Sequence, residues 1–424
     1  MDLETLAWLA GPEGADALAE ATSYDDDAHA RAAAGHAGAV DPVAAAAHLR
    51  RALPDADPVR LAAALTQVRL RRRARPRLGP LADAILLTED GLEQATRTAV
   101  ADLRARRYAE AGSTHVADLG CGLGLDAAAF ARAGLEVTAV ERDPVVAALA
   151  AHNVAALGVD DRARVMIGDV TDAQVLETAI ADADAAYVDP ARRDPARRRD
   201  GRSARVADPE AWSPSWSWVQ AVAARVPRTA AKVAPGVDHQ LNPGCATWTS
   251  VDGQLVEAEL AWPALAAAGA RRRAVVLRDG VAAVVESAVD LADEKRPRTG
   301  EVGAWLLEPD DAVIRAGLVA EIVARVDGRL LDPRVAYVTT DADVDLAPLA
   351  ARFPLRHALP YDLRRLREVL VADGIGRVVV KKRASSLDVD DVRRRLALQQ
   401  AAGSAVVLLT RIGDDPWAFV CDPA

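Results

Sequence analysis

The sequence predicts an α/β fold in which a doubly wound, mainly parallel sheet is preceded by a helical segment and followed by a smaller α/β region. Three observations lead to this prediction. From Val116 onward, apolar runs of strand length alternate with stretches of helical spacing, as is typical of parallel sheets. Several of those runs end on or beside a carboxylate, and the residues before Pro80 show helical spacing only.

The chain ahead of the sheet is expected to be helical, and we assign residues 1–83 to this N-terminal region. Asp57-Pro58 is a helix start signal, and the segment it opens closes on a basic run over residues 69–77. A further helical segment over residues 91–110 leads into the sheet.

The second predicted region, residues 84–292, holds the sheet. Its expected strands are residues 116–119, 136–140, 164–167, 185–188 and 229–234, with two more at 256–262 and 274–277. The carboxylates at the carboxyl ends of the first four strands are Asp118, Glu141, Asp169 and Asp189. Open α/β sheets bind their ligands at this edge, so we expect the site there.

A polar stretch over residues 293–300 predicts a linker to a C-terminal α/β region, residues 301–424. In that region the residue pattern predicts helices at 312–326 and 389–400 and strands at 377–380 and 405–410.

Composition excludes several classes of protein. The formal net charge of −10 argues against coating nucleic acid through bulk charge, although a local basic groove stays open. The three cysteines are too scattered for a disulfide framework, and no Cys or His spacing typical of a metal site occurs. Because the sequence shows no signal-peptide pattern and no apolar stretch of membrane-spanning length, we expect a cytoplasmic protein without a membrane or metal partner.

The run from Val116 to Asp126 is the most informative motif. Asp118 leads a loop in which Gly120, Gly122 and Gly124 alternate with single residues, and an alanine-rich helix follows. Such a loop lets a ligand approach the backbone closely. The Asp-x-Gly-x-Gly-x-Gly spacing differs from the Gly-x-Gly-x-x-Gly of dinucleotide enzymes, and a leading carboxylate suits a ligand with a cationic amine.

This run resembles the first motif of class I methyltransferases that use S-adenosyl-L-methionine, which implies a Rossmann-like sheet and that cofactor. Glu141 is positioned to accept hydrogen bonds from both ribose hydroxyls, and it would repel a 2′-phosphate. Asp169 suits the adenine amino group, and Val170 offers an apolar face to the ring. A dinucleotide-binding domain is the alternative interpretation of the loop.

The segment Tyr187 to Arg193 is the catalytic candidate. The Asp189 carboxylate and the Pro190 carbonyl can accept two hydrogen bonds from an exocyclic amine and so orient its nitrogen lone pair. The segment resembles the Asp/Asn-Pro-Pro-aromatic motif of amino-methylating nucleic-acid enzymes and the Asp-Pro-Pro-Arg motif of uridine C5 RNA methyltransferases. It departs from both at Ala191, and Cys245 is the only nearby candidate for the cysteine nucleophile that the second group needs.

Substrate-binding candidates surround this motif. Arg192, which we group with Asp189 and Pro190 as a catalytic candidate, is expected either to stack on a base or bind a phosphate, or else to pair with a loop carboxylate. Arg193, Trp216 and Lys232 are the further candidates, because arginines beside aromatic residues suit a pocket for an extruded base.

The C-terminal part, about residues 355–424, resembles the THUMP-like module of certain bacterial class I methyltransferases. THUMP modules bind structured RNA, so the resemblance implies an RNA partner. Between Arg377 and Arg395 lie seven basic and three acidic residues, and we single out Lys381, Lys382 and Arg383. The alternative is a solvated helix with Asp–Arg pairs.

The sequence thus predicts an S-adenosyl-L-methionine-dependent methyltransferase that acts on a base nitrogen of tRNA or rRNA without a metal. Two alternatives stay open: a methyltransferase for a small molecule or protein, and a non-catalytic protein that binds the cofactor and RNA. The target nucleotide and the oligomeric state are not predicted.

Overall fold

The computed structural model describes residues 1–33, 41–191, 193–199, 202–205, 208–266, 269–399 and 401–423. The chain packs as two compact units. The first unit comprises Met1–Lys232 and Trp262–Leu265, and the second comprises Val233–Ala261 and Ala266–Ala424.

The first unit begins with helices that confirm the predicted N-terminal helical segment. They are α1 (Leu3–Ala10), α2 (Pro12–Ala33), α3 (Pro42–Ala52), α4 (Pro58–Leu78) and α5 (Leu81–Ala84). Aspartates cap three of them: the side chain of Asp2 accepts from Thr5 N, and Asp41 and Asp57 cap α3 and α4 in the same way. Leucines and alanines on the inner faces of α1 to α4 form one apolar core that continues onto Leu149 of the sheet domain.

The arginines of the basic run at the end of α4 bind partners within the first unit. Arg72 pairs with Asp25 and Asp26, Arg69 and Arg73 pair with Glu89, and Arg75 pairs with Asp83. Arg71 and Arg77 donate to main-chain carbonyls. The run therefore ties α4 to its neighbours.

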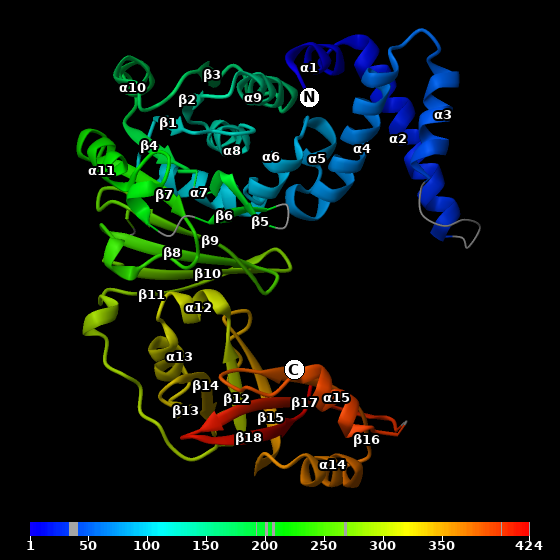
Figure 1. Ribbon diagram of the computed structural model, residues 1–424. Helices are drawn as coiled ribbons and strands as arrows, with labels where there is room; N and C mark the ends of the chain where they lie inside the picture. The colour runs from blue at the N-terminus through cyan, green and yellow to red at the C-terminus, as the bar shows by residue number, and fades with distance from the viewer. Residues whose placement is uncertain are drawn as a thin grey trace. The chain divides into compact units, whose positions relative to one another are not determined.

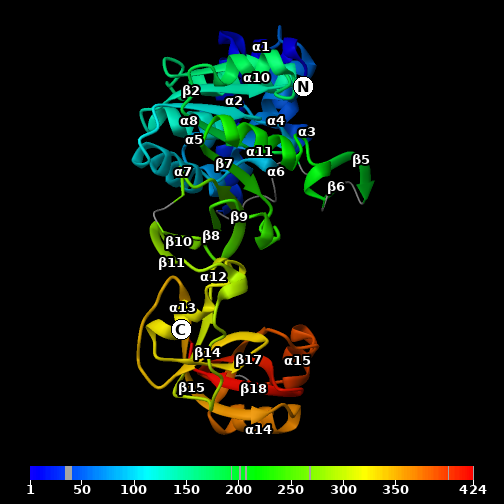
Figure 2. The same cartoon turned by 90° about the vertical axis from the view of Figure 1, so that its left-hand side faces the viewer.

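The predicted parallel sheet is confirmed in the first unit, with strand order β7-β4-β1-β2-β3. Its strands are β1 (His115–Leu119), β2 (Glu136–Glu141), β3 (Ala163–Ile167), β4 (Ala185–Val188) and β7 (Arg228–Val233). The helices between them are α8 (Leu125–Arg132), α9 (Pro144–Ala156), α10 (Ala173–Ile180) and α11 (Trp216–Arg225). Figure 1 shows α10 and α11 to the left of the strands and α8 and α9 to their right, and Figure 2 brings α10 and α11 to the front. The sheet is therefore doubly wound.

The prediction of a single helix over residues 91–110 is wrong in one respect. The structure has two helices, α6 (Glu89–Gln94) and α7 (Thr98–Glu110), because residues 95–97 leave the helical conformation. Between β4 and α11 lie the hairpin β5 (Arg193–Arg199) and β6 (Arg202–Arg205) and the turn η1 (Pro209–Ala211), which the sequence pattern did not predict.

The second unit holds two sheets. The first has the order β11-β10-β8-β9 and combines antiparallel pairs with one parallel pair, β10 with β8. Its elements are η2 (His239–Leu241), β8 (Cys245–Val251), β9 (Gln254–Ala261), β10 (Arg272–Arg278), β11 (Val281–Ser287) and η3 (Leu291–Asp293). The strands predicted at 256–262 and 274–277 correspond to β9 and β10, while β8 and β11 were missed.

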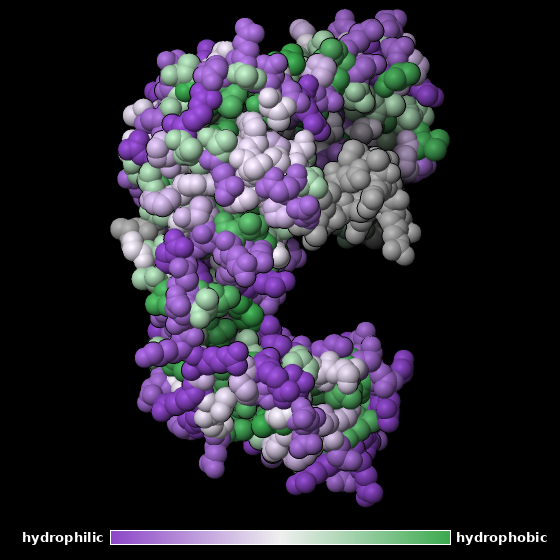
Figure 3. All heavy atoms as spheres, turned by 60° about the vertical axis from the view of Figure 1, so that its left-hand side comes forward, coloured by the Kyte–Doolittle hydropathy of each residue, from purple (hydrophilic) through white to green (hydrophobic). Residues whose placement is uncertain are grey.

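The other sheet of this unit, which we call the C-terminal sheet, has the order β13-β14-β12-β15-β18-β17-β16. Its strands are β12 (Trp305–Pro309), β13 (Arg329–Asp332), β14 (Val335–Thr340), β15 (Ala350–Pro360), β16 (Ile375–Lys382), β17 (Gly403–Ile412) and β18 (Asp415–Cys421). The helices beside it are α12 (Asp311–Arg315), α13 (Val319–Arg325), α14 (Leu363–Ala372) and α15 (Val389–Leu396). Figure 3 shows mainly hydrophilic side chains over the visible face of this C-terminal part, at the bottom of the view.

Two predicted helices of the second unit end early, for identifiable reasons. The helix predicted over residues 312–326 is divided into α12 and α13 at Gly317, whose φ is +67°. The helix predicted to reach residue 400 ends at Leu396, because Ala397 takes a left-handed conformation with φ +43°.

The predicted linker is attached to the sheet that precedes it. Arg272 of β10 is 1% exposed, pairs with Glu294 and donates to the carbonyls of Ala316 and Gly317 at 3.0 and 2.6 Å. Burial raises the pKa of Glu294 despite this pairing. The start of the polar stretch is therefore anchored by a buried arginine.

No helix in the described part of the chain is both long and apolar enough to cross a membrane.

Candidate active site

The glycine loop leaves β1 and leads into α8. Gly120, Gly122 and Gly124 have φ of +100°, +54° and +75°, a region that side chains with a Cβ rarely adopt. A Cβ on Gly122 would meet no heavy atom within 4 Å, whereas one on Gly120 would come within 3.4 Å of the Asp189 carbonyl oxygen. The loop thus presents bare backbone beside the end of β4.

Glu141, the last residue of β2, fastens this loop to the next one. Its Oε2 accepts from the Gly122 N–H at 3.1 Å, and its Oε1 accepts from the Asp143 N–H at 2.9 Å. Both carboxylate oxygens are therefore oriented by the backbone, and each keeps a lone pair for a further donor.

Asp118 lies inside β1 and is fully buried. Neither of its oxygens has a hydrogen-bond partner among the described residues. Burial, with repulsion from Asp126 and Asp189, raises the pKa of Asp118 well above its usual range. An unsatisfied buried carboxyl at a ligand-binding edge is unusual and fits a nearby cationic or donor group.

Asp169 follows β3 and is exposed. Its Oδ1 accepts from the Thr171 hydroxyl at 2.7 Å and from the Thr171 N–H at 2.9 Å, which lowers the pKa of Asp169. Val170 is buried at 8% exposed, and the Gly168 N–H donates to the Glu141 carbonyl at 3.0 Å. The ends of β2 and β3 are thereby held together.

Asp189 follows β4 and pairs with a buried lysine. Lys232 of β7 is 8% exposed and donates to Asp189 Oδ2 at 2.9 Å, to the Thr96 hydroxyl at 3.1 Å and to the Gln94 carbonyl at 3.3 Å. The break between α6 and α7 brings Gln94 and Thr96 to this lysine. An ammonium held at three points fixes the orientation of the carboxylate.

The polar network continues from Thr96 to α8 and α7 of the same unit. The Thr96 hydroxyl donates to Asp126 Oδ2 at 2.8 Å, and Asp126 pairs with Arg104 of α7. Arg104 also lies over the Tyr187 ring, 4.5 Å from its centroid. Sequence analysis missed Thr96 and Arg104. Asp126 is the last residue of the glycine-rich run, and this position was the only feature of the sequence that pointed to a functional role for it.

Three comparisons with known proteins agree with this geometry. A sequence model of S-adenosylmethionine-dependent methyltransferases matches residues 46–202, and one described as THUMP domain-like matches residues 350–423. An S-adenosylmethionine-dependent methyltransferase of Mycobacterium tuberculosis, strain H37Rv, is 35% identical over 371 residues, which cover 84% of this chain and 95% of that protein.

This chain belongs to the S-adenosylmethionine-dependent methyltransferase family. Its C-terminal part is a THUMP-like domain. The 23S rRNA (uracil(1939)-C(5))-methyltransferase RlmD of Acidithiobacillus ferrooxidans is 44% identical over 69 residues, 16% of each chain. A crystal structure of a methyltransferase from Porphyromonas gingivalis W83 shares the fold, with a TM-score of 0.68, 20% identity and coverage of 87% of this chain and 92% of that one.

The loop and strand ends of this methyltransferase fit S-adenosyl-L-methionine. The open backbone at Gly122 leaves room for the ligand, and the unsatisfied Asp118 carboxyl lies beneath the loop that would face its cationic end. We expect Glu141 to hold the ribose, and Asp169 with Val170 to hold the adenine. These roles are predictions from the sequence, and the geometry of the site is compatible with them.

The other predicted site residues lie in different settings. Pro190 is buried after Asp189, and the next residue, Ala191, exchanges two backbone hydrogen bonds with Ser213, at 2.8 and 3.0 Å. Arg192 lies outside the described residues, and Arg193 is described only as the first residue of β5. Trp216 is 4% exposed and packs against Trp212 and Trp262, a position that favours a core role over stacking on a base.

The basic residues chosen in the THUMP-like domain are engaged with other residues of the second unit. Lys381 pairs with Glu308 and lies over the Phe353 ring, Lys382 donates to the Leu387 carbonyl, and Arg383 pairs with Asp311. Their role in binding a substrate stays a prediction. No group of His, Cys, Asp and Glu side chains suited to a metal occurs in the described ranges.

Replacing Glu141 with Gln is expected to weaken binding of S-adenosylhomocysteine by about tenfold or more. The amide nitrogen of Gln would face one of two N–H donors, and the charge that attracts the ribose hydroxyls would be lost. Isothermal titration calorimetry measures the effect. Glu136→Gln, at the exposed first residue of the same strand, is the matched control and should leave the affinity unchanged. Equal affinities for E141Q and the parent protein would rule out the ribose role.

Proposed function

We propose that this methyltransferase methylates a base nitrogen of structured RNA, either tRNA or rRNA. The observation that carries the proposal is the combination, in one chain, of a THUMP-like domain with an Asp-Pro pair at the end of β4. The partial likeness to an enzyme named as an rRNA methyltransferase supports the same substrate class.

The chemistry suits an exocyclic amine. Asp189 would accept one N–H of the target amine and the Pro190 carbonyl the other, which directs the nitrogen lone pair toward the methyl donor. Lys232 holds Asp189 in one orientation through its 2.9 Å contact. The bound cofactor would supply an electrophilic methyl group. Positive charge developing on the nitrogen is stabilised by the carboxylate, which then takes up the proton.

A uridine C5 mechanism is less well supported, because it needs a cysteine nucleophile. Cys245, the first residue of β8, is 2% exposed. A nucleophilic cysteine is usually an accessible thiolate in an electropositive setting. We therefore assign Cys245 a packing role.

RNA would contact the arginines of α14 and α15. Arg393, Arg394 and Arg395 of α15 have side chains that are 52%, 76% and 62% exposed. Their pairs with Asp390 and Asp391 are exposed and three or four residues apart, so they cost little to exchange for phosphates. Arg364 of the neighbouring helix α14 is a further candidate, because its side chain is 88% exposed and its pair with Glu368 is exposed as well.

The deciding experiment compares nucleoside mass spectra of total RNA from cells with and without the gene. We expect one methylated nucleoside to disappear and to return on complementation with the parent gene. Unchanged spectra in tRNA and rRNA would exclude RNA as the substrate and favour a small molecule or a protein.

Replacing Arg393, Arg394 and Arg395 with Gln is expected to weaken binding of structured RNA by about tenfold or more and to reduce its salt dependence. Filter binding at several salt concentrations measures both. The control replaces Arg69, Arg73 and Arg75 of α4 with Gln, which removes the same charge from arginines already used within the first unit. Equal losses of RNA affinity in the two variants would show that the effect of the α15 substitutions comes from net charge alone.

A further inference from the structure

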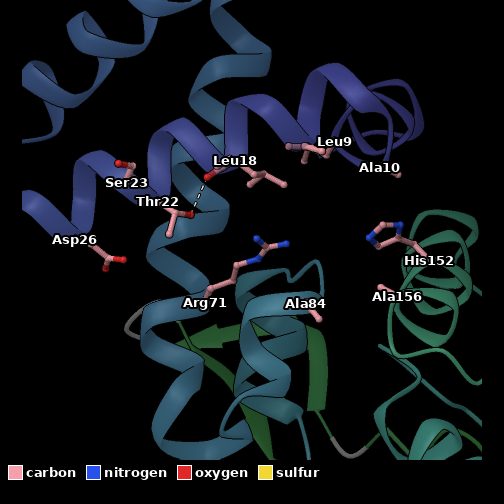
Figure 4. Close-up of a pocket in the computed structure, with 12 residues that line it drawn as sticks. Leu9, Ala10, Leu18, Thr22, Ser23, Asp26, Arg71, Ala84, His152 and Ala156 are labelled. Atoms are coloured by element: carbon pink, nitrogen blue, oxygen red, sulfur yellow. Dashed lines mark hydrogen bonds between the residues drawn. The ribbon is translucent and has the colours of Figure 1, made fainter.

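A groove separate from the glycine loop opens among the N-terminal helices and α9. Its volume is about 600 Å³, within the range of small-molecule sites. Leu9 and Leu18 form part of its apolar wall, and Ala84 and Ala156 come from α5 and α9. Figure 4 shows the side chains of Arg71 and His152 projecting into this groove, which we call the N-terminal groove.

Arg71 supplies the charge of the N-terminal groove. Its Nε donates to the Ile85 carbonyl at 2.9 Å, and its two Nη atoms meet no carboxylate at hydrogen-bond distance among the described residues. Its neighbours on α4 differ, because Arg72 is neutralised by Asp25 and Asp26 and Arg75 by Asp83. Burial lowers the pKa of Arg71, and the charge of Asp83 opposes part of this shift.

Among the residues that line the groove, Arg71 carries a positive charge and Asp26 a negative one, and the Asp26 carboxylate is already paired with Arg72. Burial and the nearby Arg71 lower the pKa of His152, so its ring is neutral at pH 7 and offers a single N–H. Asp26 lies at the rim. Ser23 adds a hydroxyl at the same end. One guanidinium fork between apolar walls matches a monoanion better than a dianion.

We propose that the N-terminal groove binds an organic carboxylate with an apolar body, its carboxylate paired with the Nη atoms of Arg71. The site is distinct from the cofactor site. Asp143, two residues after Glu141, caps the start of α9, and His152 is nine residues beyond Asp143, about 14 Å along the helix axis. The proposal does not depend on the RNA substrate.

Calorimetric titration of the full chain with hexanoate tests the proposal, in the presence of saturating S-adenosylhomocysteine so that the cofactor site is filled. We expect hexanoate to bind, and the uncharged isostere hexanamide to bind about tenfold more weakly or not at all. Arg71→Met should raise the hexanoate dissociation constant by about tenfold or more. Arg75→Met, one turn away and exposed, should leave it unchanged.

A second variant covers the case in which Arg71→Met fails to fold. Ala156→Leu fills the groove from α9 and keeps Arg71, so it should also weaken hexanoate binding. The absence of hexanoate binding to the parent protein would overturn the proposal. So would an unchanged dissociation constant in folded R71M or A156L, or tighter binding of phenyl phosphate than of hexanoate, which would show that a dianion is preferred.

Discussion

Replacing Asp189 with Asn is expected to lower the rate of methyl transfer by about a thousandfold and to change cofactor affinity by less than about twofold. The substitution removes the charge that stabilises the developing cation and accepts its proton. It preserves the size of the side chain and an oxygen for the Lys232 ammonium, which is 2.9 Å from Asp189 Oδ2. Asp189→Ala would also leave the buried lysine without its carboxylate, so its effect would combine chemistry with stability.

The measurement for Asp189 has two parts. Single-turnover transfer of a labelled methyl group to RNA from cells lacking the gene gives the rate, and calorimetric titration with S-adenosylhomocysteine gives the affinity. Asp184→Asn serves as the control, because that carboxylate lies just before β4, at the opposite end of the strand. Equal loss of rate and of cofactor affinity in D189N would make Asp189 a structural residue.

Replacing Arg104 with Met is expected to lower the free energy of unfolding by about 3–5 kcal/mol. The side chains of Arg104 and Asp126 are 2% and 13% exposed, so the variant leaves Asp126 buried without its guanidinium. Urea unfolding followed by circular dichroism measures the change.

A matched control for Arg104 exists between the same two helices. Arg132 of α8 pairs with Asp102 of α7 at 2.8 Å, but their side chains are 29% and 40% exposed. Arg132→Met should cost less than about 1 kcal/mol, since water screens the pair and solvates the remaining carboxylate. Equal effects of R104M and R132M would show that burial does not decide the strength of the inner pair.

The parallel sheet could be predicted because its information is local. Each strand is a short apolar run, and Glu141 and Asp189 mark the ends of two of them in the sequence itself. The positions at which helices break could not be predicted in this way. Residues 95–97 have helical composition, and their extended backbone is stabilised by the contacts of Thr96 with Lys232 and Asp126.

The candidate site was predicted in part for the same reason. The glycine loop and the strand-end carboxylates are consecutive signals, whereas the Lys232–Asp189 pair joins residues 43 apart and depends on β7 lying beside β4. The arginines of α4 show what a residue pattern alone leaves open. A basic run can serve internal pairing, and only the positions of Glu89, Asp83 and Asp25 reveal that it does.

The buried Arg272 has a practical consequence for dissecting the chain. A cut at residues 293–300, where the sequence suggests a natural boundary, would separate this guanidinium from the Ala316 and Gly317 carbonyls that it serves. In a C-terminal fragment beginning at residue 301, those two carbonyls would lack their hydrogen-bond donor. The turn after α12 would then lose the side chain that stabilises it. A fragment that retains the strand bearing Arg272 is the sounder starting point for studying the THUMP-like domain in isolation.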